Sequence, residues 1–199
     1  MFTDKNDIET VLLALSEQLQ AQGVKRLEIV VCGGAALNIL GFVKRTTKDV
    51  DLIAYVDEGK DGVTLITKAS PLKPELAKAA EKVQKDFNLP ANWINADPAV
   101  VVDLGLPQGL MDRVERRTYG KSLIIHFLSR LDQIHFKLYA AVDQSGGKHL
   151  DDLMALKPTS EEIEQASLWS MSQDISDGYK DVLKDMLSKI GFQDVADKL

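Results

Sequence analysis

The sequence predicts an α+β protein in which a small mixed β-sheet is flanked by helices and followed by a helical carboxyl-terminal part. Three observations support this prediction. Short β-branched runs, bounded by glycines or polar residues, lie before residue 129. Amphipathic segments with helix-capping residues lie before, between and after these runs. From Ser129 onward the patterns are helical, so we expect a core over residues 1–128 and a helical region over residues 129–199 packed on it.

The first elements follow from apolar spacing and glycine stops. Apolar residues recur every three or four positions over residues 8–19, with Thr3 or Asp4 as the cap and Gly23 as the end. A β-branched run then stops at Gly33-Gly34, small residues follow, and an alternating run comes after a polar connector. The predicted elements are helix 8–19, strand 26–32, helix 35–40, connector 43–48 and strand 49–56.

The later elements follow from proline, capping and turn signals. Pro74 suits the first turn of a helix, and Ser129 and Thr159 each precede an acidic residue at capping-box spacing. An apolar run around Val102 suits a buried strand, and the charged segment after it suits a helix. The predicted elements are helix 74–87, strand 100–104, helix 108–119, strand 121–128, and helices over 129–142, over 148–156, after Thr159 and over 179–190.

Composition excludes several classes of protein. The chain has 199 residues, 45% of them apolar, with 24 Lys+Arg, 30 Asp+Glu and a net charge of −6, which is typical of a soluble globular protein. This charge argues against broad electrostatic binding of nucleic acid. Cys32 is the single cysteine, so no internal disulfide forms. The apolar stretch 27–43 is shorter than the roughly 20 residues of a membrane span. Residues 1–10 lack a signal peptide, so we expect a cytoplasmic protein without a membrane partner.

The residues most informative about function lie where one predicted strand ends and the next begins. The first strand ends at Gly33-Gly34, and the second opens with Asp49 and Asp51. Carboxylates at positions i and i+2 of a strand point to the same face, where they repel each other unless a cation lies between them. Such a pair suits Mg²⁺. The glycines let a phosphate approach the backbone, and N–H groups at the start of the next helix bind anions. The sequence therefore predicts a metal and triphosphate site.

Each motif alone has an ordinary structural explanation. A Gly-Gly pair after a strand is more often a turn, and an Asp-x-Asp at a strand start is more often solvated surface. The two motifs together, at this spacing, favour a functional site. No Lys-Ser/Thr follows the glycines, and no dinucleotide-binding glycine pattern is present, which argues against kinases and dehydrogenases.

The two motifs resemble the pattern of the DNA polymerase β-like nucleotidyltransferase superfamily, in which an apolar-Gly-Gly turn precedes an apolar-flanked Asp-x-Asp. Cys32-Gly33-Gly34 and Asp49-Val50-Asp51-Leu52 match this pattern. The run from Gly33 to Leu52 looks more specifically like small bacterial nucleotidyltransferases related to AbiE-type toxins. The resemblance spans roughly residues 29–156 and extends to a helix with Lys137 followed by an Asp-rich helix at Asp151-Asp152.

The resemblance implies an activity and a role for each site residue. An acceptor hydroxyl attacks the α-phosphorus of a nucleoside triphosphate, and pyrophosphate leaves. Asp49 and Asp51 hold the Mg²⁺ cofactor, while Gly33 and Gly34 contact the phosphates. Nucleotide-binding roles fall to Arg45, Lys137 and Asp152.

A third catalytic carboxylate is part of the superfamily's pattern. Polymerase-like members carry it on a later apolar-flanked strand, and Val102-Asp103-Leu104 matches that context. Asp103 would act there as a second metal ligand or as base for the acceptor hydroxyl. Asp97 is a competing candidate.

The partners and the overall role stay open at this stage. The acceptor is an RNA, a protein or a small molecule, and the resemblance adds a toxin role with an antitoxin protein as partner. One rival is a non-catalytic nucleotide-binding or interaction module of the same fold, favoured if Asp103 lies away from Asp49 and Asp51. Another is a transferase acting on a small molecule such as an aminoglycoside. An acidic open cleft favours this rival, and a basic groove favours an RNA acceptor.

Overall fold

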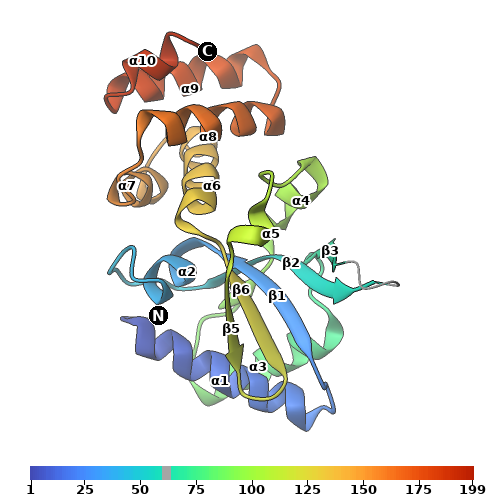
Figure 1. Cartoon of the computed structure of the whole chain (residues 1–199). Helices are drawn as coiled ribbons and strands as arrows, with labels where there is room; N and C mark the ends of the chain where they lie inside the picture. Colours follow the sequence, from blue (N-terminus) through green and yellow to red (C-terminus); the bar gives the residue numbers. More distant parts are fainter. Residues whose placement is uncertain (60–63) are drawn as a thin grey trace. The chain divides into compact units, whose positions relative to one another are not determined.

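The computed structural model describes residues 1–59 and 64–199, and the chain divides into two compact units. Met1–Asp103 and Met111–Leu128 form the first, which we call the sheet unit. Leu104–Leu110 and Ser129–Leu199 form the second, the helical unit. Figure 1 labels the elements of both. One mixed sheet with helices before and after its strands confirms the predicted α+β fold.

The sheet unit contains a mixed six-stranded sheet within the described residues. Its strands are β1 (Leu27–Cys32), β2 (Val50–Glu58), β3 (Thr64–Lys68), β4 (Ile94–Asn95), β5 (Glu115–Tyr119) and β6 (Leu123–Phe127). The order is β3-β2-β1-β6-β5, and β4 pairs with the start of β2. Strand β1 is parallel to β6 and antiparallel to β2. Because of the antiparallel pairing, the end of β1 lies beside the beginning of β2. The glycine turn and the two carboxylates therefore meet at the same end of the sheet.

A β-bulge in β2 changes which face its side chains occupy. Between the pairs made by Val30 and by Val31, β2 contains one extra residue, Ile53. Leu52 and Tyr55, three residues apart, consequently both belong to the core on one face of the sheet. Asp51, next to Leu52, faces the opposite side.

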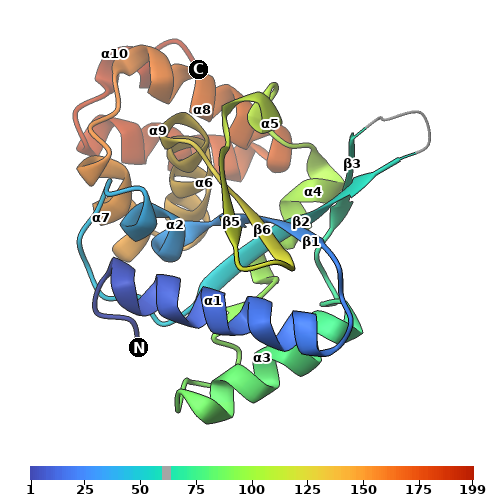
Figure 2. The same cartoon turned by 60° about the horizontal axis from the view of Figure 1, so that its bottom comes forward.

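Helices α1 (Lys5–Ala21) and α3 (Pro74–Asp86) lie side by side against one face of the sheet (Figure 2). The Asp4 carboxylate caps α1 by accepting hydrogen bonds from the backbone N–H groups of the first turn. Apolar residues of both helices and of the sheet form one continuous buried core. Trp93 is 1% exposed there, and its Nε1–H donates to the carbonyl oxygen of Ala80 at 3.0 Å. The short helix α2 (Gly33–Ile39) connects β1 to the segment before β2. The predicted helices 8–19, 35–40 and 74–87 are confirmed.

The helical unit consists of helices packed around α6 (Arg130–Asp143). The others are α7 (Lys148–Ala155), α8 (Ser160–Gln173), α9 (Asp177–Lys189) and α10 (Gln193–Ala196). Ser129 caps α6, and Thr159 with Glu162 forms a reciprocal capping box at α8, as predicted. Trp169 stacks on Phe136 with ring centroids 5.3 Å apart. No helix in residues 1–59 and 64–199 combines the length and the hydropathy needed to cross a membrane.

Two predictions in the middle of the chain are wrong. Residues 100–104 are not a strand but lie in the helical turns η2 (Asp97–Val100) and α4 (Val101–Leu104). Pro98 favours a helical first turn, and Val100 and Leu104 are 48% and 47% exposed, unlike a buried strand.

Residues 108–119 are also not one charged helix, because they divide into α5 (Leu110–Arg113) and the strand β5. An edge strand with exposed charges has the same composition as a helix surface, which explains the error. Strands β3 and β4 and helix α10 were not predicted.

Candidate functional site

Gly33 lies in direct contact with the carboxylate of Asp51. Its φ of +72° is a left-handed conformation that glycine adopts without strain. A Cβ atom built on Gly33 would lie 2.3 Å from Oδ2 of Asp51, closer than any side chain tolerates. The pairing of Cys32 with Asp51 across β1 and β2 produces this approach. Glycine is therefore required here both by backbone conformation and by space.

Gly34 lies against the connector before β2. A Cβ atom on it would lie 2.6 Å from Oγ1 of Thr47 and 3.0 Å from Nη2 of Arg45. Asn38 fixes this arrangement, because its Nδ2 donates to the Gly34 carbonyl at 2.9 Å and its Oδ1 accepts from the Arg45 backbone N–H at 3.3 Å. The Thr47 backbone pairs with that of Phe2. The Arg45 guanidinium is thus held beside the glycine turn.

Asp49 and Asp51 are both half-buried and each accepts a hydrogen bond. Oγ1 of Thr47 donates to Oδ1 of Asp49 at 3.3 Å, and Nδ2 of Asn95 donates to Oδ1 of Asp51 at 3.1 Å. Asn95 belongs to β4 and pairs directly with Asp51 in the sheet. The structure therefore brings Gly33, Gly34, Arg45 and both carboxylates together in the sheet unit.

Asn95 is the polar neighbour of Asp51 that the sequence did not reveal. Strand β4 has only two residues, too few to give a periodic pattern. It is positioned by buried Trp93, whose carbonyl accepts from the Val50 backbone N–H at 2.7 Å. The residue facing Asp51 from the neighbouring strand is thus an amide and not a third carboxylate.

The donor set of this site fits Mg²⁺. In the described part of the chain, no three His, Cys, Asp or Glu residues cluster as a metal site. Mg²⁺ does not need such a cluster, since it commonly uses one or two carboxylates together with waters and substrate phosphates. Asp51 at the start of β2 and Asp49 just before it offer two carboxylates at this end of the sheet, and Gly33 leaves room beside Asp51.

Asp103 lies outside this group of contacts. It belongs to α4, its side chain is 56% exposed, and its carboxylate forms an ion pair with Lys68 of β3. Its expected strand context is wrong, whereas its role as a second metal ligand or base stays a prediction. Asp97 is exposed at the start of η2, where its backbone N–H donates to Oδ1 of Asn95 at 3.0 Å.

Lys137 and Asp152 bind each other inside the helical unit. The Lys137 ammonium lies 2.8 Å from the Asp152 carboxylate, and the side chains are 5% and 1% exposed. They join α6 to α7. This contact gives both residues a structural role, and their nucleotide-binding roles stay predictions.

Replacing Lys137 with methionine is expected to lower the free energy of unfolding by about 3 kcal/mol, because Asp152 would keep a buried charge without this cation. Urea denaturation measures the change. Lys148→Met, which removes an exposed lysine from the start of α7, is the control and should stay within about 0.5 kcal/mol of wild type. Equal losses in the two variants would contradict a stabilising ion pair.

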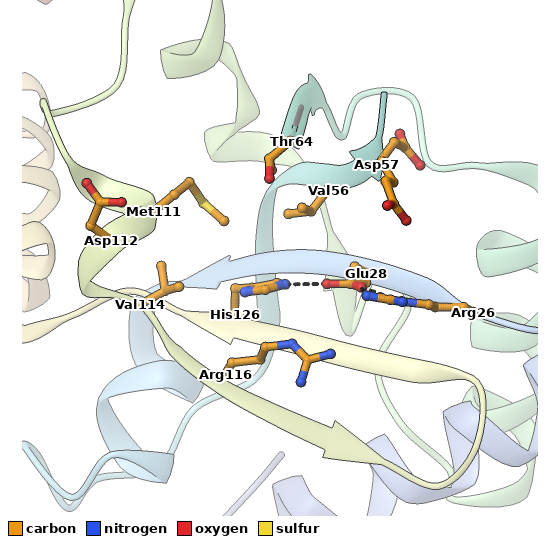
Figure 3. A pocket seen from close by; sticks show the side chains of 11 residues that line it. Arg26, Glu28, Val56, Asp57, Thr64, Met111, Asp112, Val114, Arg116 and His126 are labelled. Atoms are coloured by element: carbon orange, nitrogen blue, oxygen red, sulfur yellow. Dashed lines mark hydrogen bonds and ion pairs between the residues drawn. The ribbon is translucent and has the colours of Figure 1, made fainter. Parts of the chain in front are cut away.

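A cavity of about 850 Å³ lies on the sheet unit, between the sheet and α5 (Figure 3). Nε2 of His126 lies 2.6 Å from Oε2 of Glu28, and Nε of Arg26 donates to Oε1 of Glu28 at 2.5 Å. Burial raises the pKa of Glu28, but the hydrogen bonds from His126 and Arg26 outweigh burial. The Glu28 pKa therefore lies below its ordinary value of 4.5. We call this pocket the sheet-face cavity.

Because the pKa of Glu28 is lowered in the folded state, the protein is expected to lose stability as the pH becomes acidic. A carboxyl group with a depressed pKa in the folded state stabilises the fold above its ordinary pKa, and loses this contribution as the pH falls through the folded-state pKa. Wild type is expected to exceed Glu28→Gln in melting temperature at pH 6, and the difference should narrow steadily below pH 4.5. Thermal melts of both proteins across this range measure it. A constant difference would show that Glu28 does not act through its charge.

Comparison with known proteins gives one match. The sequence model of a family described as "Nucleotidyltransferase of unknown function (DUF6036)" matches residues 10–148. This range contains the glycine turn, the connector and both carboxylates. No curated protein and no solved structure matches the sequence significantly.

Proposed function

The chain belongs to the DUF6036 family of nucleotidyltransferases of unknown function, and on this basis we propose that it transfers a nucleoside monophosphate from a nucleoside triphosphate to an acceptor hydroxyl with Mg²⁺ as cofactor. One observation carries the proposal: the backbone of Gly33 touches the carboxylate of Asp51. Glycine turn and carboxylate pair therefore share one site, so that phosphate and metal would meet there.

The residues of the site would have different roles in the reaction. Asp49 and Asp51 would hold Mg²⁺, which when bound polarises the phosphate and neutralises charge that develops on it. Gly33 and Gly34 have no side chains, so phosphate oxygens can reach the backbone N–H groups. Arg45, held beside Gly34, would bind the phosphates that leave as pyrophosphate.

The proposed reaction exchanges one phosphorus–oxygen bond for another. The acceptor oxygen forms a bond to the α-phosphorus, and the bond from that phosphorus to the bridging oxygen of pyrophosphate breaks. The hydroxyl proton must pass to a base, the role predicted for Asp103. Asp103 would first have to leave its ion pair with Lys68, and Lys137 would have to leave Asp152 to contact a phosphate.

The resemblance to AbiE-type proteins supports a further proposal, that the transferase is the toxin of a toxin–antitoxin pair and binds an antitoxin protein. Its test is growth of bacteria after induced expression. Arrest by wild type but not by Asp51→Asn would support a toxin whose effect depends on transfer.

Transfer of label tests the proposed activity directly. The protein is incubated with each α-³²P-labelled nucleoside triphosphate and Mg²⁺, together with RNA, protein or small-molecule fractions of a cell extract. Label that moves to one fraction, and that is lost with Asp51→Asn or with a chelator, would support the proposal. Nucleotide binding without transfer to any fraction would instead favour the non-catalytic module, for which the exposed position of Asp103 already argues.

A further inference from the structure

The sheet-face cavity and the site formed by Gly33 and Asp51, which we call the carboxylate site, lie on the same face of the same sheet. Glu28, Val30 and Cys32 alternate along β1 and share one face, and pairing places His126 beside Val30 and Asp51 beside Cys32. His126 on β6 and Asp51 on β2 flank β1, so they are two strands apart and two residues apart along the sheet, about 12 Å between backbones. A ligand in the cavity that extends this far along the face would reach Asp51.

An uncommitted cation lines the cavity. Arg116 pairs with His126 across β5 and β6, so both side chains face the same side. Among residues 1–59 and 64–199 the side chain of Arg116 has no ion-pair or hydrogen-bond partner, whereas the charge of Arg26 is matched by Glu28. The whole lining contains two arginines and four carboxylates, Glu28, Asp57, Glu58 and Asp112, so the net charge of +1 on Arg26, Glu28 and Arg116 is local to the part of the cavity at Arg116. An oxyanion, either a carboxylate or a phosphate, suits a guanidinium.

His126 supplies a second, independent observation. Its side chain is 8% exposed, it lines the cavity, and its Nδ1 is buried with no hydrogen-bond partner among the described residues. The ionised carboxylate of Glu28 only accepts hydrogen bonds, so Nε2 carries the proton that faces it. In the neutral ring, Nδ1 is then an acceptor, and a ligand hydroxyl is a donor that would satisfy it.

The rest of the lining favours a small ligand. Val56 and Met111 provide apolar contacts from opposite sides of the cavity (Figure 3). Glu58 and Asp112 are exposed carboxylates that also line it, so a ligand with many negative charges, such as the phosphate chain of an RNA, is disfavoured, whereas a single anionic group can lie at Arg116. A volume of about 850 Å³ lies within the range of small-molecule sites.

We propose that the sheet-face cavity binds the acceptor of the transfer, a small molecule with a hydroxyl group and one carboxylate or phosphate group. This inference rests on the proposed function and names the substrate class for it. Arg116 binds the anionic group, and His126 accepts a hydrogen bond from a hydroxyl group.

The binding test uses three related probes: glycerol 3-phosphate, glycerate and glycerol. Two-dimensional NMR of the full chain follows the backbone signals of Arg116 and His126. We expect at least one charged probe to shift these signals saturably and glycerol to leave them unchanged. The choice between phosphate and carboxylate follows from which probe binds.

Variants identify the site. Arg116→Ala is expected to weaken binding of the charged probe about 10- to 100-fold, the loss of a charge-assisted hydrogen-bonded contact. Lys121→Ala removes an equally exposed cation outside the cavity and should leave binding unchanged. Absence of shifts, or equal shifts in Arg116→Ala, would overturn the inference.

The transfer assay separates this inference from the function on which it rests. With the small-molecule fraction as acceptor, Arg116→Ala should raise the acceptor concentration needed for half-maximal rate and leave the KM for the nucleotide unchanged. Label that moves only to RNA or protein would overturn the acceptor assignment while the transferase stands. Probe binding without transfer to any fraction would overturn both.

Discussion

Asp51→Asn is expected to reduce the rate of nucleotidyl transfer about 1,000-fold, the scale on which loss of a charge-stabilising group slows catalysis. The substitution keeps the shape of the side chain and can still accept the hydrogen bond from Asn95, but it removes the negative charge that would hold Mg²⁺. Initial rates at saturating nucleotide and Mg²⁺ measure the effect, with circular dichroism to establish that the fold persists.

Asp86→Asn is the matched control for this charge change. Asp86 is exposed at the end of α3 and belongs to the same unit, so its replacement should leave the rate within a factor of two, about the scatter expected for surface positions.

Asp103→Asn then tests the third carboxylate. A loss comparable to that of Asp51→Asn would establish a catalytic role for Asp103, and wild-type rates would remove it from the mechanism. Full activity of Asp51→Asn itself would contradict the proposed site.

Gly33→Ala is expected to reduce the rate of nucleotidyl transfer about as much as Asp51→Asn does, even though it changes no charge. The added methyl group would lie 2.3 Å from Oδ2 of Asp51, so the carboxylate must rotate away from its position. A left-handed backbone also costs alanine about 1 kcal/mol of stability. Transfer rate and urea denaturation measured on the same preparation give both effects.

Gly23→Ala separates backbone strain from loss of space. Gly23 has a φ of +81°, close to that of Gly33, and nothing lies within 4 Å of the position that an added Cβ atom would take. This variant should show the same loss of stability, about 1 kcal/mol, with an unchanged transfer rate. If both variants were equally active, contact between residue 33 and the Asp51 carboxylate would not matter for catalysis.

Local patterns sufficed for the elements that carry the predicted site. The apolar run that stops at two glycines and the alternating run after Asp49 are strong signals because both strands are buried for most of their length. The caps at Ser129 and Thr159 are equally local, since each depends on a hydrogen bond within one turn.

The errors arose where tertiary pairing decides the structure. Residues 115–119 are charged and become a strand because β6 offers a hydrogen-bonding partner, not because of their own periodicity. Val101 is the one residue of α4 that is buried, so a short apolar run was mistaken for a strand.

Only the part of the candidate site that comes from neighbouring segments of the sequence could be predicted. The proximity of Gly33 to Asp51 and of Gly34 to Arg45 and Thr47 follows from consecutive elements, and the structure shows these contacts, with Thr47 in turn bound to Asp49. The position of Asn95 beside Asp51 depends on a parallel pairing between segments 44 residues apart, which no local pattern encodes. The buried pair of Glu28 and His126 is likewise set by strand order and is separated by 98 residues in sequence.

The bulge at Ile53 determines how the chain tolerates insertions and deletions. If Ile53 were kept but the bulge were absent, regular alternation from Tyr55 would turn Asp51 to the face covered by α1 and α3, where its carboxylate would be buried without a cation. Deletion of Ile53 alone would remove the bulge and leave Leu52 and Asp51 on their present faces, whereas insertion of one residue beside an unchanged bulge would exchange the two faces. The candidate site therefore depends on which face of the sheet each side chain of β2 occupies, and not only on which residues the strand contains.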